Sequence, residues 1–401
     1  MAVLLLPMTK KRNIPPRSFA NTRFFPGCEG NPFDRLLHSL EIFERIPAVF
    51  VLFLLAFLAV LGSLPQIIKI GSLTYWSFAL LVFFTVDWLL IAGLGRSGRS
   101  FGPAKIIVLV LAVLRVPFAL LPFAWNLSFE IAGTLLVVYG FWIEPFWVDL
   151  HLETISSEKL SPRKTFRVLH LGDLHMERIT RREKWILQKV RECTPDLIVF
   201  SGDVLNLSYL KDETAQADAL AFFNSLSAPL GIYGVSGSPA VDKPEFISRL
   251  AAQTGFTWLN DDIKSIDTTA GRINLIGVTC SQNPDKDEVV LSNLLDKASL
   301  SANGFNLLLY HSPDLAPNAS RLGVDLQLSG HTHGGQVRLP LIGALYSGSL
   351  YGKRLEAGRY VVNGMTLYTS RGLGMEGAFA PRVRLLCRPE MICWTFTNNA
   401  D

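Results

Sequence analysis

The segment DLQLSGHTHGGQ, residues 325–336, joins a short apolar run to two closely spaced histidines. The run over residues 325–328 predicts a β-strand, and His331 and His333 follow its end directly. In α/β folds, side chains just beyond the carboxyl ends of strands form the ligand sites. The segment therefore predicts a strand with a functional site at its end.

Three further segments repeat this arrangement of an apolar run followed by polar residues. The polar residues are Asp173 and His175 in LGDLH, Asp203 in SGDVLN, and His311 in LYHSP. The runs before them cover residues 166–171, 196–200 and 305–310. Helix-like stretches over 181–191 and 215–226, with strand-like runs over 230–235 and 272–278, complete an alternation typical of an α/β layer.

The six Asp and His residues at these strand ends suit a metal centre. Carboxylate and imidazole together are ligands for Mn, Fe or Zn, and two ions that share a carboxylate would use all six groups. One Asp or His after a strand is more often a capping or core residue, but four such clusters in sequence favour a site. His151 and His170 stand outside the clusters, and we interpret both as structural.

At this point the chain resembles a known family. From about Phe166 to Phe396 it is similar to the calcineurin-like metallophosphoesterases, and SRGLG (370–374) and RPEMI (388–392) resemble their bacterial membrane-associated branch. The resemblance implies a two-sheet sandwich flanked by helices, with two divalent ions at the sheet ends. By motif, the ligands would be Asp173, His175 and His333 for one ion, His311 and His331 for the other, and Asp203 as the bridge.

One family motif is missing. Where the family has Gly-Asn-His followed by an acid, this chain has Gly237, Ser238, Pro239 and Ala240. In the family the Asn binds the second ion and the His protonates the leaving group or steadies the transition state. A positioned general acid contributes about 10²–10⁴-fold in rate, and proline has no proton to donate. Ser238 offers a hydroxyl in place of the amide, so the second site is expected to be weaker.

Three interpretations remain open. The enzyme is active on substrates whose leaving group needs little protonation, such as a pyrophosphate-linked nucleotide. Alternatively, the domain is a catalytically degenerate module that binds metal and a phospholipid. In the third, another group, such as Asp242, Arg371 or His170, supplies the missing function. Arg371 is a candidate phosphate-binding residue because a guanidinium fork fits phosphate oxygens, although a surface salt bridge explains it equally well.

The first part of the chain has a different composition. The whole chain is 49% hydrophobic and 18% charged, and the apolar excess is concentrated before residue 149. Runs over residues 46–64, 73–94, 105–121 and 129–147 predict a bundle of about four transmembrane helices within 46–148. Arg115 and Pro117 make the third run the weakest.

Two ionisable residues within these runs lie at similar depths. Asp87 and Arg115 are therefore expected to form an ion pair between neighbouring helices. This pair either serves helix packing or belongs to a lipid or ion pathway.

Basic residues predict the orientation and the domain limits. They crowd a basic N-terminal arm (1–45) and the loop after residue 94, which places both chain ends on the cytoplasmic side, in a bacterial inner membrane. A linker over 149–164 would lead to the phosphoesterase domain over 165–401. Net charge is only +4, so nucleic acid is not an expected partner, whereas membrane lipids are.

The combined prediction is a membrane-anchored, metal-dependent phosphoesterase that hydrolyses a phosphodiester or pyrophosphate bond. The anchor favours a phosphorylated, lipid-linked substrate, since tethering raises the local concentration of a molecule in the same bilayer. Some relatives in the superfamily hydrolyse UDP-2,3-diacylglucosamine, which makes this compound a candidate.

Overall fold

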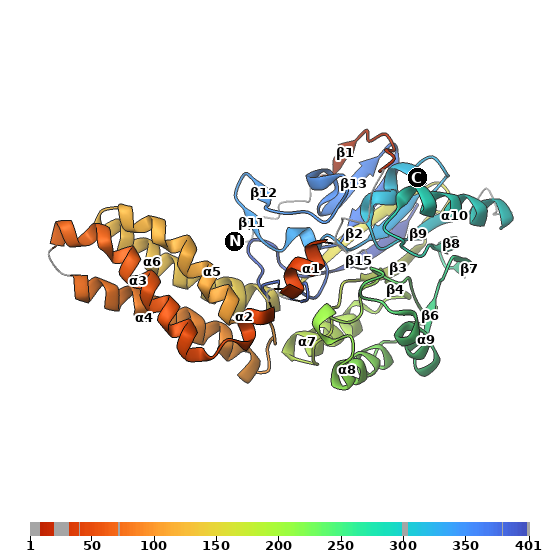
Figure 1. Ribbon diagram of the computed structural model, residues 1–401. Coiled ribbons are helices and arrows are strands. Elements are labelled where there is room, and N and C mark those ends of the chain that lie inside the picture. Colours follow the sequence, from red (N-terminus) through yellow and green to blue (C-terminus); the bar gives the residue numbers. More distant parts are fainter. Residues whose placement is uncertain are drawn as a thin grey trace. The chain divides into compact units, whose positions relative to one another are not determined.

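The computed structural model describes residues 9–19, 32–39, 41–70, 73–298, 304–378 and 380–398 (Figure 1). The chain forms two compact units. The helical unit consists of Asp34–Pro145 together with the short segment Gly377–Arg384. The β-sheet unit consists of Met1–Phe33, Phe146–Glu376 and Leu385–Asp401.

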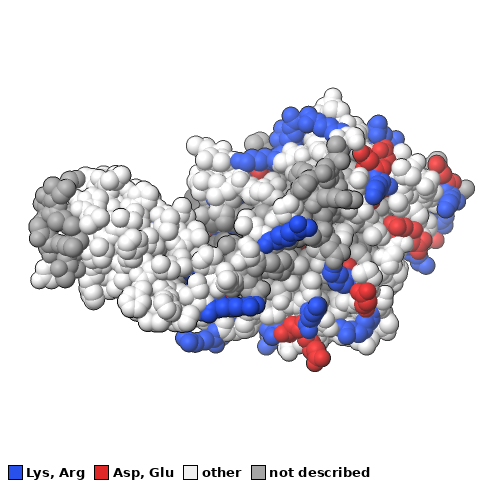
Figure 2. Space-filling model, viewed as in Figure 1, with Lys and Arg blue, Asp and Glu red and all other residues white. Residues whose placement is uncertain are grey.

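The helical unit is built from long apolar helices. Its elements are α1 (Pro32–Ser39), α2 (Glu41–Arg45), α3 (Ala48–Ile70), α4 (Leu73–Arg96), α5 (Lys105–Arg115) and α6 (Phe123–Val137). Three stretches are long and apolar enough to cross a membrane: Ala48–Pro65, Tyr75–Arg96 and Phe123–Phe146. Figure 2 shows almost no charged side chains on the visible face of this unit.

The third predicted span has a different structure from the other three. Helix α5 ends at Arg115 after 11 residues, and a 3₁₀ segment, Val116–Leu120, follows it. Pro117 lies in that segment, and proline has no N–H to continue an α-helical hydrogen-bond ladder. In the described residues, three helices are therefore long and apolar enough to span a membrane. The predicted count of four is not confirmed.

A buried ion pair joins the helices of this unit. The Arg115 guanidinium lies 2.7 Å from the Asp87 carboxylate, which confirms the predicted pair. It also lies 3.2 Å from Glu130 on α6, a contact that the sequence did not suggest. Gly133 makes room for it, because a Cβ there would lie 2.7 Å from the Arg115 Nε. One arginine thus bridges two buried carboxylates.

In its described residues, the β-sheet unit contains two large β-sheets and a short hairpin. The first sheet has the order β2-β15-β3-β4-β5-β6, the second β1-β13-β14-β10-β9-β8-β7, and the hairpin is β11-β12. The first sheet comprises β2 (Asp149–Ser156), β3 (Thr165–Leu171), β4 (Leu197–Phe200), β5 (Ile232–Gly234), β6 (Phe256–Trp258) and β15 (Glu390–Thr397). The second comprises β1 (Lys10–Arg12), β7 (Asp262–Thr268), β8 (Gly271–Gly277), β9 (Phe305–Leu309), β10 (Leu326–Ser329), β13 (Gly358–Val362) and β14 (Met365–Thr369).

Apolar side chains from both sheets form one shared core. Val168 and Trp394 from the first sheet and Leu307 and Leu328 from the second are fully buried in the same cluster. Facing apolar sheets of this kind are the defining feature of a β-sandwich. The predicted sandwich is thus the observed architecture of this unit.

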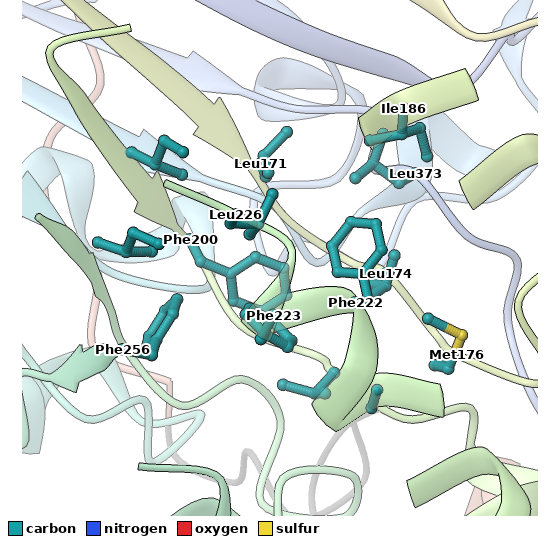
Figure 3. Packing of buried hydrophobic residues seen from close by; sticks show 14 of the residues in the cluster. Leu171, Leu174, Met176, Ile186, Phe200, Phe222, Phe223, Leu226, Phe256 and Leu373 are labelled. Carbon is teal, nitrogen blue, oxygen red and sulfur yellow. The ribbon is translucent and has the colours of Figure 1, made fainter. Parts of the chain in front are cut away.

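Helices cover the outer faces of the sandwich. The helices are α7 (Arg181–Cys193), α8 (Glu213–Asn224), α9 (Pro244–Gln253), α10 (Pro284–Lys297) and α11 (Ala316–Ala319). Phe222 and Phe223 of α8 pack with Phe200 of β4, and Phe256 of β6 belongs to the same cluster (Figure 3). Each fully buried phenylalanine contributes about 1.5–3 kcal/mol. On the second sheet, Leu291 of α10 lies in the corresponding outer cluster.

The limits of the two units differ from the expected ones. The predicted linker 149–164 contains β2, which pairs in parallel with β15 over its whole length. The apolar residues of β2 do not all lie on one face of the strand. The sequence therefore lacks the alternation of apolar and polar residues that predicts a strand. In the predicted basic arm, β1 pairs with β13, and Ile14 is buried in the core. The segment Gly377–Arg384, expected in the phosphoesterase domain, belongs to the helical unit.

Candidate metal centre

Parallel strands bring the predicted site residues to one edge of each sheet. In the first sheet β3, β4 and β5 run parallel, and in the second β9, β10 and β14 do. The carboxyl ends of parallel strands lie at the same edge. The residues that follow these ends are Asp173 and His175 (β3), Asp203 (β4), Ser238 (β5), His311 (β9), His331 and His333 (β10), and Arg371 (β14).

Six of these side chains form two groups of three. Each group has its ligand atoms within 4.8 Å of one another, and all six residues are buried. The groups are Asp173, His175 and His333, and Asp203, His311 and His331. The structure thus brings together the residues that the family resemblance implied as ligands, and their role in metal binding stays a prediction.

Asp203 lies between the two groups. Its Oδ2 is 3.5 Å from His175 Nε2 in one group and 3.3 Å from His311 Nε2 in the other. Its Oδ1 accepts a hydrogen bond of 2.6 Å from the Ser238 backbone N–H. A carboxylate in this place can contact both ions, as the predicted bridging ligand must.

Hydrogen bonds set the orientation of the imidazole rings. His311 Nδ1 lies 2.8 Å from the Ser201 carbonyl, and a carbonyl can only accept, so Nδ1 carries the proton. Nε2 of His311 then carries the lone pair that can bind a metal ion. His175 and His333 bring their Nε2 atoms within 2.9 Å of each other. The two nitrogens thus face each other in the first group of candidate ligands.

The backbone at five of the six positions is in the left-handed region. The φ angles are 46° at Asp173, 42° at His175, 58° at Asp203, 70° at His331 and 50° at His333. Outside glycine this conformation costs about 1–2 kcal/mol per residue. Such residues persist where the surrounding structure holds them, and they cluster at functional sites. The strand ends are therefore held in shape by the fold.

Two glycines allow the loops to approach the carboxylates. A Cβ on Gly330 would lie 2.6 Å from both oxygens of Asp173, and a Cβ on Gly237 would collide with the Asp203 backbone N and Oδ1. With Gly330 in place, the His331 N–H donates to both Asp173 oxygens at 3.0 Å. Gly237 is the one residue of the missing motif that this chain retains, and this close approach requires it.

Asp242 fixes the loops around Asp203. Its carboxylate accepts hydrogen bonds from the backbone N–H groups of Asp203 (2.9 Å), Val204 (2.9 Å) and Gly237 (2.7 Å). Burial, together with the neighbouring Asp203 charge, raises the Asp242 pKa to about 6. The sequence suggested Asp242 only as a substitute catalytic group. Its contacts give it a positioning role. The sequence signal for this role was the place of Asp242, two residues after Ala240, where the family has an acidic residue.

The charge balance of the centre suits bound cations. Burial raises the pKa of Asp173 to about 6. Burial would lower the pKa of His311, but the Asp203 carboxylate raises it to about 9. For His331, burial and then the neighbouring His311 lower the pKa to about 3. Among the described residues no lysine or arginine forms an ion pair with Asp173 or Asp203. This mixed Asp and His donor set fits Mn, Fe or Zn.

Ser238 lies beside the second group. Its Oγ is 3.1 Å from His311 Nε2 and 3.3 Å from Asp203 Oδ2, and the side chain is buried. The position that the family fills with asparagine is thus occupied by a hydroxyl at hydrogen-bond distance from two predicted ligands. Pro239 follows it, with no proton to donate.

Arg371 is engaged by other protein groups. Its Nε donates to Glu390 at 2.8 Å, and its Nη2 lies 2.6 Å from His151 Nε2. The adjacent Gly372 packs on Asp173, since a Cβ there would lie 2.5 Å from the Asp173 Cβ. These contacts fit the salt-bridge alternative for Arg371, and its role in phosphate binding stays a prediction.

His170, the other proposed substitute, is also buried. Its Nε2 lies 3.0 Å from Ser201 Oγ, and burial lowers its pKa to about 4. A neutral imidazole inside β3 fits the structural interpretation.

Sequence comparison gives the family of this site. Residues 166–335 match the model of the calcineurin-like phosphoesterases. The uncharacterized metallophosphoesterase YkuE of Bacillus subtilis (strain 168) is 31% identical over 272 residues, which cover 65% of this chain and 89% of YkuE. The chain belongs to the calcineurin-like phosphoesterases.

Two further relatives are similar to this chain at lower sequence identity. The uncharacterized metallophosphoesterase YkoQ of B. subtilis (strain 168) is 28% identical, over 61% of this chain and 89% of YkoQ. The phosphodiesterase YaeI of Escherichia coli (strain K12) is 28% identical, over 63% of this chain and 90% of YaeI. Family membership indicates a hydrolase of phosphate esters that uses divalent metal ions.

Proposed function

We propose that this chain is a membrane-anchored phosphodiesterase that depends on two divalent metal ions. The observation that carries the proposal is the pair of buried donor groups on either side of Asp203. The relative YaeI, which is named a phosphodiesterase, supports the same class of reaction.

Each group would hold one ion. Asp173, His175 and His333 would bind the first, His311 and His331 the second, and Asp203 both. When bound, the ions supply positive charge that polarises the phosphate and makes a water molecule a better nucleophile. The chain's own part is to keep the ligands in place, through Asp242 on the Asp203 loop and the Ser201 carbonyl on His311.

The leaving group sets the range of substrates. Without an imidazole at position 239, no side chain there protonates a departing alkoxide. A pyrophosphate bond, whose leaving phosphate needs little protonation, suits this site better than an alkyl ester. A nucleotide-linked lipid such as UDP-2,3-diacylglucosamine belongs to that class.

Replacing Ser238 and Pro239 together, by Ser238→Asn and Pro239→His, tests this assignment. A new general acid is expected to raise hydrolysis of an alkyl phosphodiester by about 10²–10⁴-fold. The gain with bis(p-nitrophenyl) phosphate, whose leaving group is already good, should be much smaller. Initial rates on the two substrates measure the difference, and equal gains on both would show that a missing acid does not limit this enzyme.

The alternative function is a degenerate module that binds one metal ion and a phospholipid. Pro239 favours it, because the second site lacks the family's Asn-His pair. Metal content by mass spectrometry of the full chain, purified with Mn supplied, separates the two. We expect two ions per chain and hydrolysis of bis(p-nitrophenyl) phosphate. One ion per chain without hydrolysis would establish the degenerate module instead.

The proposal includes a cytoplasmic orientation in a bacterial inner membrane. Helix α5 with its 3₁₀ extension is about 27 Å long at the usual rise per residue. This length approaches the thickness of the hydrocarbon core, about 30 Å, so α5 and the 3₁₀ segment together can serve as a fourth crossing. Four crossings put both chain ends on one side, and the basic residues near the helix ends favour the cytoplasm.

The lipid-linked substrate follows from the anchor. A tethered enzyme meets a lipid in the same membrane at a high effective concentration, while it gains little with a soluble nucleotide. We therefore propose membrane lipids and a phosphorylated, lipid-linked compound as the partners of this chain.

A further inference from the structure

The hairpin β11 (Arg338–Leu339) and β12 (Gly343–Ala344) carries an exposed apolar tip. The eight residues 339–346, LPLIGALY, contain no charged side chain. Leu341 is 109% exposed, Ile342 and Leu345 are each 57% exposed, and Tyr346 is 50% exposed. Four large side chains in one short segment thus face away from the protein.

The tip holds a leucine in a conformation that leucine disfavours. Leu341 has φ 65°, and the Ile342 N–H donates to the Pro340 carbonyl at 2.8 Å. A three-residue turn with a positive central φ is rare and strained, and glycine or asparagine would accept it at lower cost. The positive φ and the exposure of the side chain to water are both unfavourable for leucine. Burial of the side chain in hydrocarbon is favourable and would offset them.

A cationic side chain contacts the hairpin at its tip. Lys353 donates from Nζ to the Ile342 carbonyl at 3.0 Å, and Lys353 and Arg354 are both exposed. Arg338 is paired with Glu356 at 2.7 Å. An apolar tip with exposed cations beside it suits a bilayer surface, where anionic headgroups lie over hydrocarbon.

Both ends of the hairpin reach the loops of the metal centre. At the first end, a Cβ on Gly335, two residues after His333, would lie 2.5 Å from the Ala344 Cβ. At the second end, a Cβ on Gly348 would lie 3.5 Å from His331 Nε2. The return strand of the hairpin and the residues after it therefore pack on the loops that carry the predicted ligands.

Chain connectivity favours the bilayer as the occupant. Leu385 binds the base of the hairpin, accepting from the Arg338 N–H at 2.9 Å and donating to the Gln336 carbonyl at 2.9 Å. The preceding residue, Arg384, is the last of the segment that belongs to the helical unit. Its N–H donates at 3.0 Å to the carbonyl of Gly140, within the apolar stretch Phe123–Phe146. The residue before Leu385 thus hydrogen-bonds to a stretch that is long and apolar enough to cross a membrane.

We propose that the β11-β12 hairpin inserts Leu341 and Ile342 into the lipid bilayer beside the metal centre. The inserted tip holds the centre at the headgroup level, where it meets the phosphate of a lipid. This inference rests on the proposed function, since it names the bilayer as the place where the substrate is taken up.

The test places a fluorescent probe on the hairpin of the full chain. A Leu341→Cys variant, with Cys28→Ser to remove a competing thiol, is labelled with the environment-sensitive dye NBD in lipid nanodiscs. The four described native cysteines are buried. Val289→Cys, on α10 and 59% exposed, is the matched control. We expect a blue-shifted emission at position 341 that brominated lipids quench, and a water-like, unquenched emission at position 289.

Two results would overturn the proposal. A water-like emission at 341, equal to that at 289, would place the tip in water. A blue-shifted emission that brominated lipids do not quench would place it against protein, either this chain or a second copy. The fluorescence measurement does not require catalysis. A chain that shows the quenching but hydrolyses no substrate would contradict the proposed function and still support insertion of the hairpin.

A second variant, Leu341→Asn, guards against misfolding. Asparagine accepts the positive φ more readily than leucine, so the melting temperature is expected to stay the same or rise. With an active chain, the KM for a lipid phosphodiester in nanodiscs should rise while kcat/KM for bis(p-nitrophenyl) phosphate stays the same. An unchanged KM for the lipid would count against insertion.

Discussion

Replacing Asp203 with asparagine is expected to abolish metal binding at both groups and phosphodiester hydrolysis with it. The carboxylate lies between His175 and His311, and an amide in its place offers one neutral oxygen where two charged ones stood. Changes to residues that merely support a ligand cost about 10–100-fold in metal affinity, so the loss of a shared ligand should exceed about 100-fold. Metal content per chain and the rate on bis(p-nitrophenyl) phosphate measure the effect.

Asp267→Asn is the matched control for this variant. Asp267 lies on β7 of the same unit, pairs with Arg272 at 2.8 Å, and is largely exposed. An exposed pair contributes about 0.2–1 kcal/mol, so metal content and rate should both stay normal. If Asp203→Asn kept two ions and a normal rate, the assignment of Asp203 as the shared ligand would be wrong.

Replacing Arg115 with methionine is expected to destabilise the helical unit by about 3–5 kcal/mol, the usual effect of removing one partner from a buried ion pair. Methionine keeps most of the volume but leaves Asp87 and Glu130 buried without a positive charge. Unfolding of the full chain in detergent, followed by the helical circular dichroism signal, measures the loss.

The control and the rescue separate charge from packing. Arg96→Met, at the exposed end of α4, should change the stability little. Neutralising the carboxylates in the triple variant Asp87→Asn, Arg115→Met, Glu130→Gln should restore most of the stability. A triple variant as unstable as Arg115→Met alone would mean that the guanidinium acts through packing.

Much of the centre could be predicted from the sequence because its information is local. Each metal-binding candidate stands within four residues of the end of an apolar strand, so the motif and the strand can be recognised together. Parallel strands then bring separate motifs to one edge, as they do for Asp173 and Asp203. The family prediction, which used the same motifs, is confirmed.

The contacts that support the centre were harder to predict because they join distant segments. Glu390 pairs with Arg371 through a strand, β15, that lies between β2 and β3 in the sheet. Asp242 reaches the Asp203 loop from the next strand end. In the helical unit, nothing about Glu130 in isolation shows that it shares Arg115 with Asp87. Such pairings depend on three-dimensional packing, for which one sequence carries no periodic signal.

The membership of Gly377–Arg384 in the helical unit has a practical consequence for protein production. A fragment that begins at Asp149, chosen to obtain the catalytic half in soluble form, would keep this segment but lose Gly140, which accepts the Arg384 N–H. It would also lose β1 and the buried Ile14 at the edge of the second sheet. Truncation at the apparent domain boundary would thus expose two surfaces at once, and the full-length chain in detergent or lipid is the sounder starting material for crystallisation and assay.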